Sequence, residues 1–147
     1  MQEHLEIVKK RFERDNYAKF LGIVLDELTD DTIQMHMQLQ ENMLNWFNRP
    51  HGGAIYALAD AAFSVLGNNT NNLSVALDCS ITYHASPDSG TILIVEGETL
   101  SATKRTVAIL FNVYMEQEGT LFSGNRKLPY REASPYMGEA SQLSCNL

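Results

Sequence analysis

The chain has 147 residues, of which 44% are hydrophobic and 20% are charged, and its formal net charge is −7. These values predict one globular domain and argue against non-specific binding to nucleic acid. No apolar run approaches the roughly 18 residues that a membrane span needs. Residues 1–4 lack the features of a signal peptide, so we expect a cytoplasmic protein that has no membrane partner.

The first 40 residues predict a helix and two strands. Residues 3–14 indicate a short amphipathic helix, and residues 20–28 are apolar enough for a first strand. Residues 32–39 alternate between apolar and polar, which is typical of a half-buried strand in an antiparallel sheet. His36 falls on the polar side of that strand, so we expect a solvated side chain.

A long helix is predicted between Pro50, a residue suited to a helix start, and Gly67, a residue suited to a helix stop. One side of this helix is apolar and must face a core; it carries Ile55, Leu58, Ala59, Ala62, Phe63 and Leu66. The opposite side carries Gly53, Ala57, Asp60, Ala61 and Ser64. All of these except Asp60 are small. A carboxylate among small residues is costly unless it is paired or used.

The second half of the chain predicts four more strands, over residues 73–83, 91–100, 107–115 and 120–127, with a hairpin turn at 116–119. The first of them has an apolar face made by Leu73, Val75, Leu77, Cys79, Ile81 and Tyr83. One long helix and about six mostly antiparallel strands indicate an α+β fold. We expect one domain over residues 1–131 and a polar C-terminal extension over residues 132–147.

The start of the long helix has the composition of an anion site. His51 is followed by Gly52 and Gly53, and the first backbone N–H groups of a helix lack intrahelical partners. Such groups can bind an anion or a developing oxyanion. Asp60 lies eight residues further on, about 12 Å along the helix axis. Because catalytic contacts are about 3 Å long, one reacting group can reach both only if two helices meet around a two-fold axis in a homodimer.

Asn45, His51-Gly52-Gly53 and Leu58-Ala59-Asp60, at these spacings, resemble hotdog-fold acyl-CoA thioesterases of the phenylacetate-degradation type. The resemblance extends over residues 21–126. It implies a hotdog fold in which the sheet wraps the long helix. It also implies hydrolysis of an acyl-CoA to free acid and CoA, and we expect a homodimer that pairs into a dimer of dimers.

The resemblance assigns roles to individual residues. The Gly52 N–H would polarise the thioester carbonyl, and Asp60 would act as general base or nucleophile, with both options open. Asn45 and His51 would be the polar residues beside them. The substrate-binding residues would be Gly53, Trp46, Phe47, Tyr56, Phe63, Ser64, Lys104 and Arg105.

Lys104 and Arg105 are the predicted contacts to the CoA phosphates, and Arg49 is a second candidate for that role. Trp46 and Phe47 stand where members of the family often carry a small or polar residue, so the family does not identify the acyl group. No cofactor is expected apart from the CoA of the substrate. The four histidines lie on different predicted elements, which argues against a metal site.

Three alternatives remain open. The first is an acyl-thioester dehydratase or hydratase of the same fold, in which His51 and Asp60 would transfer protons. The second is a non-catalytic acyl-CoA-binding regulatory module. The third is a purely structural dimerisation domain, which would leave Asp60 unexplained.

Overall fold

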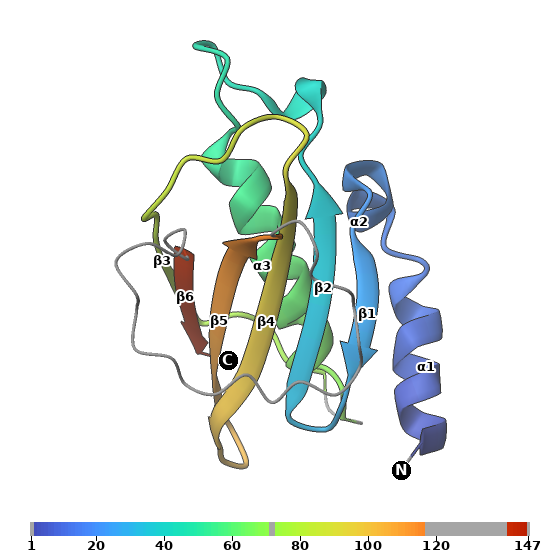
Figure 1. Cartoon of the computed structure of the whole chain (residues 1–147). Helices are drawn as coiled ribbons and strands as arrows, with labels where there is room; N and C mark the ends of the chain where they lie inside the picture. Colours follow the sequence, from blue (N-terminus) through green and yellow to red (C-terminus); the bar gives the residue numbers. More distant parts are fainter. Residues whose placement is uncertain (1, 71–72, 117–140, 147) are drawn as a thin grey trace.

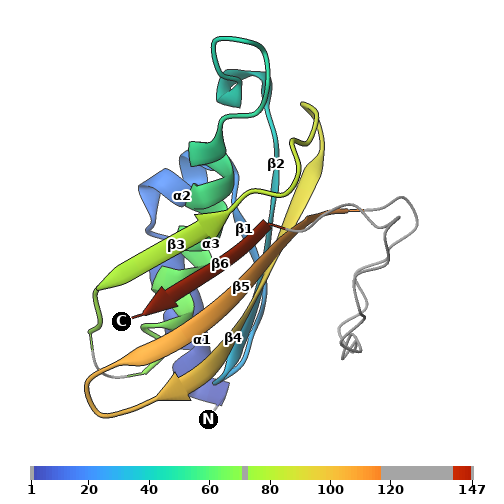
Figure 2. The same cartoon turned by 90° about the vertical axis from the view of Figure 1, so that its left-hand side faces the viewer.

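The computed structural model describes residues 2–70, 73–116 and 141–146. A six-stranded sheet with the strand order β1-β2-β4-β5-β6-β3 lies against the long helix α3 (Figure 1). All neighbouring strands in this sheet are antiparallel. Figure 2 shows the strand direction turning from β2 to β3 as the sheet twists around α3. The predicted α+β class, the central helix and the antiparallel sheet are confirmed, and five of the six predicted strands have a counterpart among the described residues.

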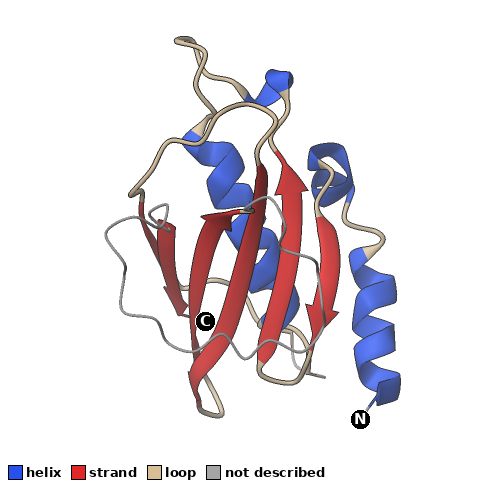
Figure 3. Ribbon diagram, in the orientation of Figure 1, coloured by secondary structure: helices blue, strands red, loops and turns tan. Residues whose placement is uncertain are grey.

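The N-terminal region forms two helices before the first strand, where the sequence predicts one. They are α1 (Gln2–Phe12) and α2 (Asn16–Leu21), followed by β1 (Val24–Leu28). Figure 3 shows α1 beside β1, at the edge of the sheet. The predicted strand over residues 20–28 is wrong in its first part, because α2 is held by caps at both ends. The Asp15 carboxylate accepts the backbone N–H groups of Tyr17 and Ala18, and Gly22 ends the helix at φ 70°.

The helix α3 (Gly52–Leu66) presents its apolar side to the sheet, as predicted. Leu58, Ala59 and Ala62 are fully buried, and Phe63 packs edge-to-face on Phe111 at a centroid distance of 6.1 Å. The sheet contributes buried residues from β2 (Thr32–Gln38), β4 (Ile92–Ala102) and β5 (Val107–Met115). A short 3₁₀ helix, η1 (Glu41–Met43), leads from β2 towards the start of α3.

The strand β3 (Asp78–Thr82) is shorter than predicted and lies at the edge of the sheet. Leu73, Val75 and Leu77 precede it and are 90%, 73% and 70% exposed. Their predicted place on a buried face is wrong within the single chain, because they lie before β3 and outside the sheet. Cys79, predicted as a core thiol, is half-buried against the core.

The last strand, β6 (Ser141–Asn146), pairs with both β3 and β5. It belongs to the segment 132–147, for which the sequence predicts an extension with little core. The predicted strand over residues 120–127 and most of the turn before it lie outside the described residues. The domain boundary at residue 131 stays a prediction.

The outer face of the sheet carries a polar pair that changes the interpretation of His36. Its Nδ1 lies 2.8 Å from the Asp26 carboxylate, and the imidazole is only 27% exposed. The predicted solvated histidine is therefore wrong, because β1 brings Asp26 alongside it. No helix in the described part of the chain is long and apolar enough to cross a membrane.

Candidate active site

The first turn of α3 leaves one backbone donor available at Gly52. His51 is the N-cap residue, with extended backbone angles. Its Nδ1 accepts the N–H of Gly53 at 2.8 Å, and its carbonyl oxygen accepts the N–H of Ala54 at 2.9 Å. The Gly52 N–H has no acceptor among the described residues. This pattern singles out the Gly52 N–H as the group that can bind an anion at the helix N-terminus.

The hydrogen bond from the Gly53 N–H also defines which tautomer the His51 ring adopts. A ring nitrogen that accepts a hydrogen bond carries no proton, so Nδ1 is unprotonated while the cap is intact. The proton of the neutral ring is then on Nε2, which can donate outward. The His51 side chain therefore stabilises the helix start and still presents one N–H donor.

Tyr83, just beyond the end of β3, packs directly on Gly52. Its hydroxyl donates to the Gly52 carbonyl oxygen at 3.0 Å. A Cβ atom added to Gly52 would lie 3.3 Å from the tyrosine ring and hydroxyl, a tight contact that a small movement of the Tyr83 side chain would relieve. Burial raises the pKa of Tyr83, so it remains a protonated donor. The sequence pattern places Tyr83 on a core face and does not predict this contact. The one indication in the sequence is that a tyrosine hydroxyl on a core face needs a hydrogen-bond partner.

Asp60 lies on the open side of α3 near the half-buried Ala57, whereas Ala61, predicted on the same side, is buried in the core. Partial burial raises the pKa of its carboxyl group, and the negative charge of Asp15 raises it further. Because α3 is continuous from Gly52 to Leu66, the axial separation of about 12 Å between Gly52 and Asp60 holds in the folded chain. One chain therefore does not bring the two groups to a common reacting atom.

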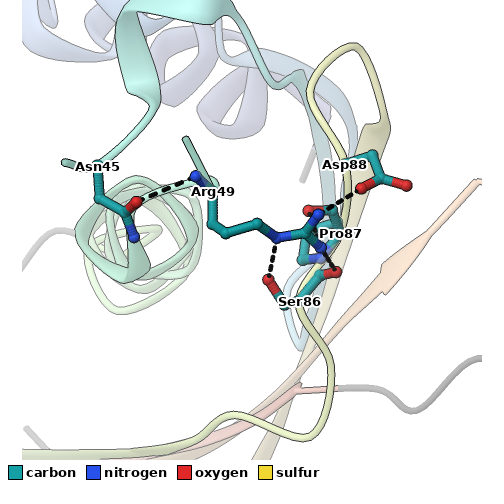
Figure 4. A network of polar contacts seen from close by, with 5 residues as sticks. All are labelled: Asn45, Arg49, Ser86, Pro87 and Asp88. Carbon is teal, nitrogen blue, oxygen red and sulfur yellow. Dashed lines mark hydrogen bonds and ion pairs between the residues drawn. The ribbon is translucent and has the colours of Figure 1, made fainter. Parts of the chain in front are cut away.

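Asn45 is built into the loop that precedes α3. Its Oδ1 accepts the backbone N–H groups of Phe47 at 3.1 Å and Arg49 at 3.0 Å, the second of which is drawn in Figure 4. Its own N–H donates to the Arg49 carbonyl oxygen at 2.7 Å. Since Oδ1 is occupied, the part of the side chain that can bind substrate or water is the Nδ2 amide group.

The aromatic residues proposed for an acyl pocket separate into different environments. Trp46 is 93% exposed and Phe47 is 54% exposed, at the tip of the loop before α3. Tyr56 is half-buried on α3. Phe63 is 2% exposed in the core, so its position does not support contact with a surface ligand.

The remaining predicted binding residues are spread along the molecule. Gly53 and Ser64 are exposed on α3, at its first and last turns. Lys104 and Arg105 lie in the turn between β4 and β5, at the opposite end of the sheet from the start of α3 (Figure 1). Within one chain these two cations are not beside Gly52.

A hollow of about 630 Å³ lies elsewhere, between α1, α2 and β1, and is lined by Phe12, Ala18, Ile23 and Leu25 with charged residues around them. Asp15 is one of the charged residues that line it. This hollow is separate from the Gly52 turn.

Comparisons with known proteins agree with the fold and the family. The family model described as the thioesterase superfamily matches residues 47–122, slightly more than half of the chain. The acyl-coenzyme A thioesterase PaaI of Escherichia coli K12 is 28% identical over 131 residues, which cover 88% of this chain and 91% of the relative.

Solved structures show the same architecture. The structure of E. coli PaaI, described as coming from the phenylacetic acid degradation operon, has a TM-score of 0.80 at 20% identity, covering 99% of this chain and 91% of that chain. A protein of Streptococcus pneumoniae TIGR4, named a hypothetical thioesterase and solved with coenzyme A, has a TM-score of 0.73 at 16% identity, covering 93% and 92%. The chain belongs to the thioesterase superfamily, and its resemblance to hotdog-fold acyl-CoA thioesterases of the phenylacetate-degradation type is confirmed.

Proposed function

We propose that this protein hydrolyses the thioester bond of an acyl-CoA, giving a free acid and CoA, at a site shared by two subunits of a homodimer. The observation that carries the proposal is that the Gly52 N–H has no acceptor among the residues the structure describes, while the next two N–H groups of the helix start are hydrogen-bonded to His51. The name of the E. coli relative and the CoA in the S. pneumoniae structure support the substrate class.

In this mechanism the Gly52 N–H donates to the thioester carbonyl oxygen and stabilises the negative charge that develops there. Asp60 of the facing subunit either removes a proton from the attacking water or attacks the carbonyl carbon itself. The C–S bond then breaks and the CoA thiolate leaves. If Asp60 was the attacking group, the acyl group is left on its carboxylate as a mixed anhydride, which water hydrolyses to release the free acid and restore Asp60. Because thiols have a pKa of about 8.5, the thiolate leaves without a strong general acid.

Asn45 and His51 complete the proposed site. The Nδ2 group of Asn45 would donate to the substrate or water, since its Oδ1 already accepts two backbone N–H groups. The Nε2 of His51 would donate near the carbonyl, while Nδ1 keeps the helix capped. Lys104 and Arg105 would bind the CoA phosphates from another copy of the chain, because their own turn is remote from Gly52.

The dimer is supported by two independent features. The open side of α3 is lined by small residues, which allow a second helix to come close. Leu73, Val75 and Leu77 expose large apolar side chains in the segment that leads into the edge strand β3, an arrangement typical of an association surface. Pairing of two such dimers into a tetramer remains part of the proposal.

The activity is tested by following free thiol released from short-chain, long-chain and aryl acyl-CoAs. We expect rapid release with one class, which would also identify the acyl group. Formation of an enoyl product from a 3-hydroxyacyl-CoA without free thiol would instead establish a dehydratase. Binding without turnover would establish a regulatory module.

The role of the Gly52 N–H is tested by Gly52→Pro. Proline is favoured at the first helical position, where it replaces the N–H with a ring carbon and adds a Cβ atom, and the φ −66° and ψ 131° of His51 suit a residue before proline. We expect a folded protein whose kcat is lower by about 10²–10³-fold, the usual effect of losing one oxyanion donor. Gly52→Ala is the matched control, because it places a Cβ atom beside Tyr83 but keeps the N–H. Equal activity of the two variants would remove Gly52 from the mechanism.

A further inference from the structure

Arg49 lies four residues after Asn45 and three before Gly52, in a loop that is closed at its base by the bridge between Leu44 and Pro50. Its backbone is fixed to Asn45 from both directions, through the Arg49 N–H to Oδ1 and the Arg49 carbonyl oxygen to the Asn45 N–H. A movement of Arg49 would therefore displace Asn45 directly, and it would reach Gly52 through the two residues between them.

The guanidinium group of Arg49 is hydrogen-bonded to the segment between β3 and β4, as Figure 4 shows. Nε donates to Ser86 Oγ at 3.2 Å, and Nη1 donates to the Asp88 carboxylate at 2.7 Å. Nη2 donates to the Ser86 carbonyl oxygen at 2.7 Å and to that of Pro87 at 3.3 Å. All three nitrogens have acceptors within the chain, so a CoA phosphate would have to displace these contacts.

The same β3–β4 segment also holds the other side of this turn. Tyr83 donates to the Gly52 carbonyl oxygen at 3.0 Å, only three residues before Ser86. Residues 83–88 thus hydrogen-bond the loop at two positions, Arg49 and Gly52, which are separated by only two residues. This arrangement fixes the direction of the Gly52 N–H by contacts that come from a distant part of the sequence.

We propose that Arg49 is a positioning residue, which aligns the Gly52 N–H and the Asn45 amide by anchoring their loop to residues 86–88. The proposal rests on the proposed function for its kinetic consequence, and it replaces the role of Arg49 as a phosphate ligand. Since an error of about 1 Å in a reacting geometry can cost about 10²-fold in rate, loosening this anchor lowers kcat.

The first experiment compares Arg49→Gln with wild type on an acyl-CoA and on the corresponding acyl-pantetheine, which has no phosphate groups. We expect kcat to fall about tenfold or more on both substrates, with KM changed less than twofold. Arg49→Lys, which keeps the charge and one contact, should give an intermediate kcat, as should Ser86→Ala, which removes the Nε acceptor. Arg11→Gln, an exposed arginine on α1, is the matched control and should behave as wild type.

A phosphate ligand predicts the opposite pattern. In that case Arg49→Gln would raise KM for the acyl-CoA and leave the acyl-pantetheine unchanged, and this result would overturn the proposal.

The second experiment needs no turnover. Hydrogen exchange of the backbone amides of residue 49 and residues 51–54 is measured in substrate-free protein, with thermal unfolding to check that each variant is folded. We expect faster exchange in Arg49→Gln and not in Arg11→Gln. Unchanged exchange would overturn the proposal even in an active enzyme. Faster exchange in a protein that releases no thiol would refute the proposed function and leave the anchoring role of Arg49 standing.

Discussion

The sequence identifies Asp60 as the candidate general base, and the raised pKa of its carboxyl group agrees with that role. A carboxyl group on the small-residue side of α3 is partly buried, and Asp15 adds a second negative charge nearby. Both effects oppose ionisation, so the carboxylate is a stronger base than an ordinary aspartate. This is the property that a general base working near neutral pH requires.

Replacing Asp60 with Asn should lower kcat by about 10²–10⁴-fold, the usual contribution of a general base. In wild type, kcat/KM should fall as the pH falls through the raised pKa of Asp60, because only the ionised form acts. A pH–rate profile of wild type and Asp60→Asn checks this. An Asp60→Asn variant with wild-type turnover would show that the site is wrongly assigned.

The same raised pKa makes a prediction about stability. A folded-state pKa above the unfolded value means that the native state loses stability as pH rises through the folded pKa. Asp60→Asn should therefore be more stable than wild type at pH 7, and the difference should vanish below about pH 4, where the unfolded carboxyl is also protonated. Urea unfolding at both pH values measures this. A constant difference would mean that desolvation of the carboxylate is not the cause.

His51 combines a structural and a chemical role that substitutions can separate. His51→Ala removes the N-cap of α3 and should cost about 1 kcal/mol of unfolding free energy. His51→Ser, which can cap through its hydroxyl, should keep wild-type stability but lose activity if Nε2 contacts the substrate. Thermal unfolding and kcat measured on the same samples separate the two roles. Full activity in His51→Ser would limit His51 to capping.

At the scale of the elements, the close packing of β4 on its neighbours depends on one glycine. Gly97 pairs with Ile33 on β2 and Phe111 on β5. A Cβ atom built at Gly97 would lie 2.3 Å from Phe111 Cε1 and 2.9 Å from Ile33 Cγ2. The fully buried Phe111 ring thus occupies the space that a side chain at Gly97 would need.

Gly97→Ala should therefore lower the unfolding free energy by about 1–3 kcal/mol through overpacking. Adding Phe111→Leu should return part of this loss, because the smaller side chain leaves room for the methyl group. Ser101→Ala, on an exposed part of the same strand, is the control. Strictly additive effects of the first two substitutions in urea unfolding would contradict the packing explanation.

Two elements show how local sequence signals compete. Residues 20–23 are apolar enough for a strand, but Asp15 and Gly22 cap a helix that includes Phe20 and Leu21. Residues 73–77 alternate like a strand, yet they lie outside β3 and their apolar side chains are exposed. The helix caps decide the structure of the first segment, and the second has no neighbouring strand among the described residues.

At the scale of the whole molecule, the proposed dimer should depend on that exposed apolar stretch. Replacing Leu73, Val75 and Leu77 together with Ser should give a folded monomer without thioesterase activity, since each site would lack one of its two subunits. Light scattering after size-exclusion chromatography, with circular dichroism, checks mass and fold. Ile7→Ser, an exposed apolar residue on α1, is the control. A persistent active dimer would place the interface elsewhere.

A shared site also predicts complementation between two inactive variants. Mixed dimers of Gly52→Pro and Asp60→Asn contain one site with both groups intact, so random pairing should restore about one quarter of wild-type activity. Refolding the two variants together, and separately as controls, tests this. No recovery in a mixture shown to contain mixed dimers would mean that Gly52 and Asp60 do not act across subunits.

The sequence alone determined the features that depend on neighbours along the chain. The 3.6-residue spacing of Ile55, Leu58 and Ala62 identified the buried side of α3, and alternation identified β2 and β5. The His51-Gly52-Gly53 motif and Asp60 identified the family, which the comparisons confirm. These signals are readable because helix and strand periodicities are local properties of the backbone.

The tertiary structure alone decided which groups at the site are free and which are held. Only the folded chain shows that, within its described part, the Gly52 N–H lacks an acceptor while the Gly53 N–H is bound by His51. It also shows that Tyr83 packs on Gly52 and that the Arg49 side chain is hydrogen-bonded to residues 86–88. Tyr83 and Arg49 meet partners 31 to 39 residues away in sequence. Such contacts depend on how β3 and its following segment pack against the start of α3, and no periodic pattern in the sequence encodes that packing.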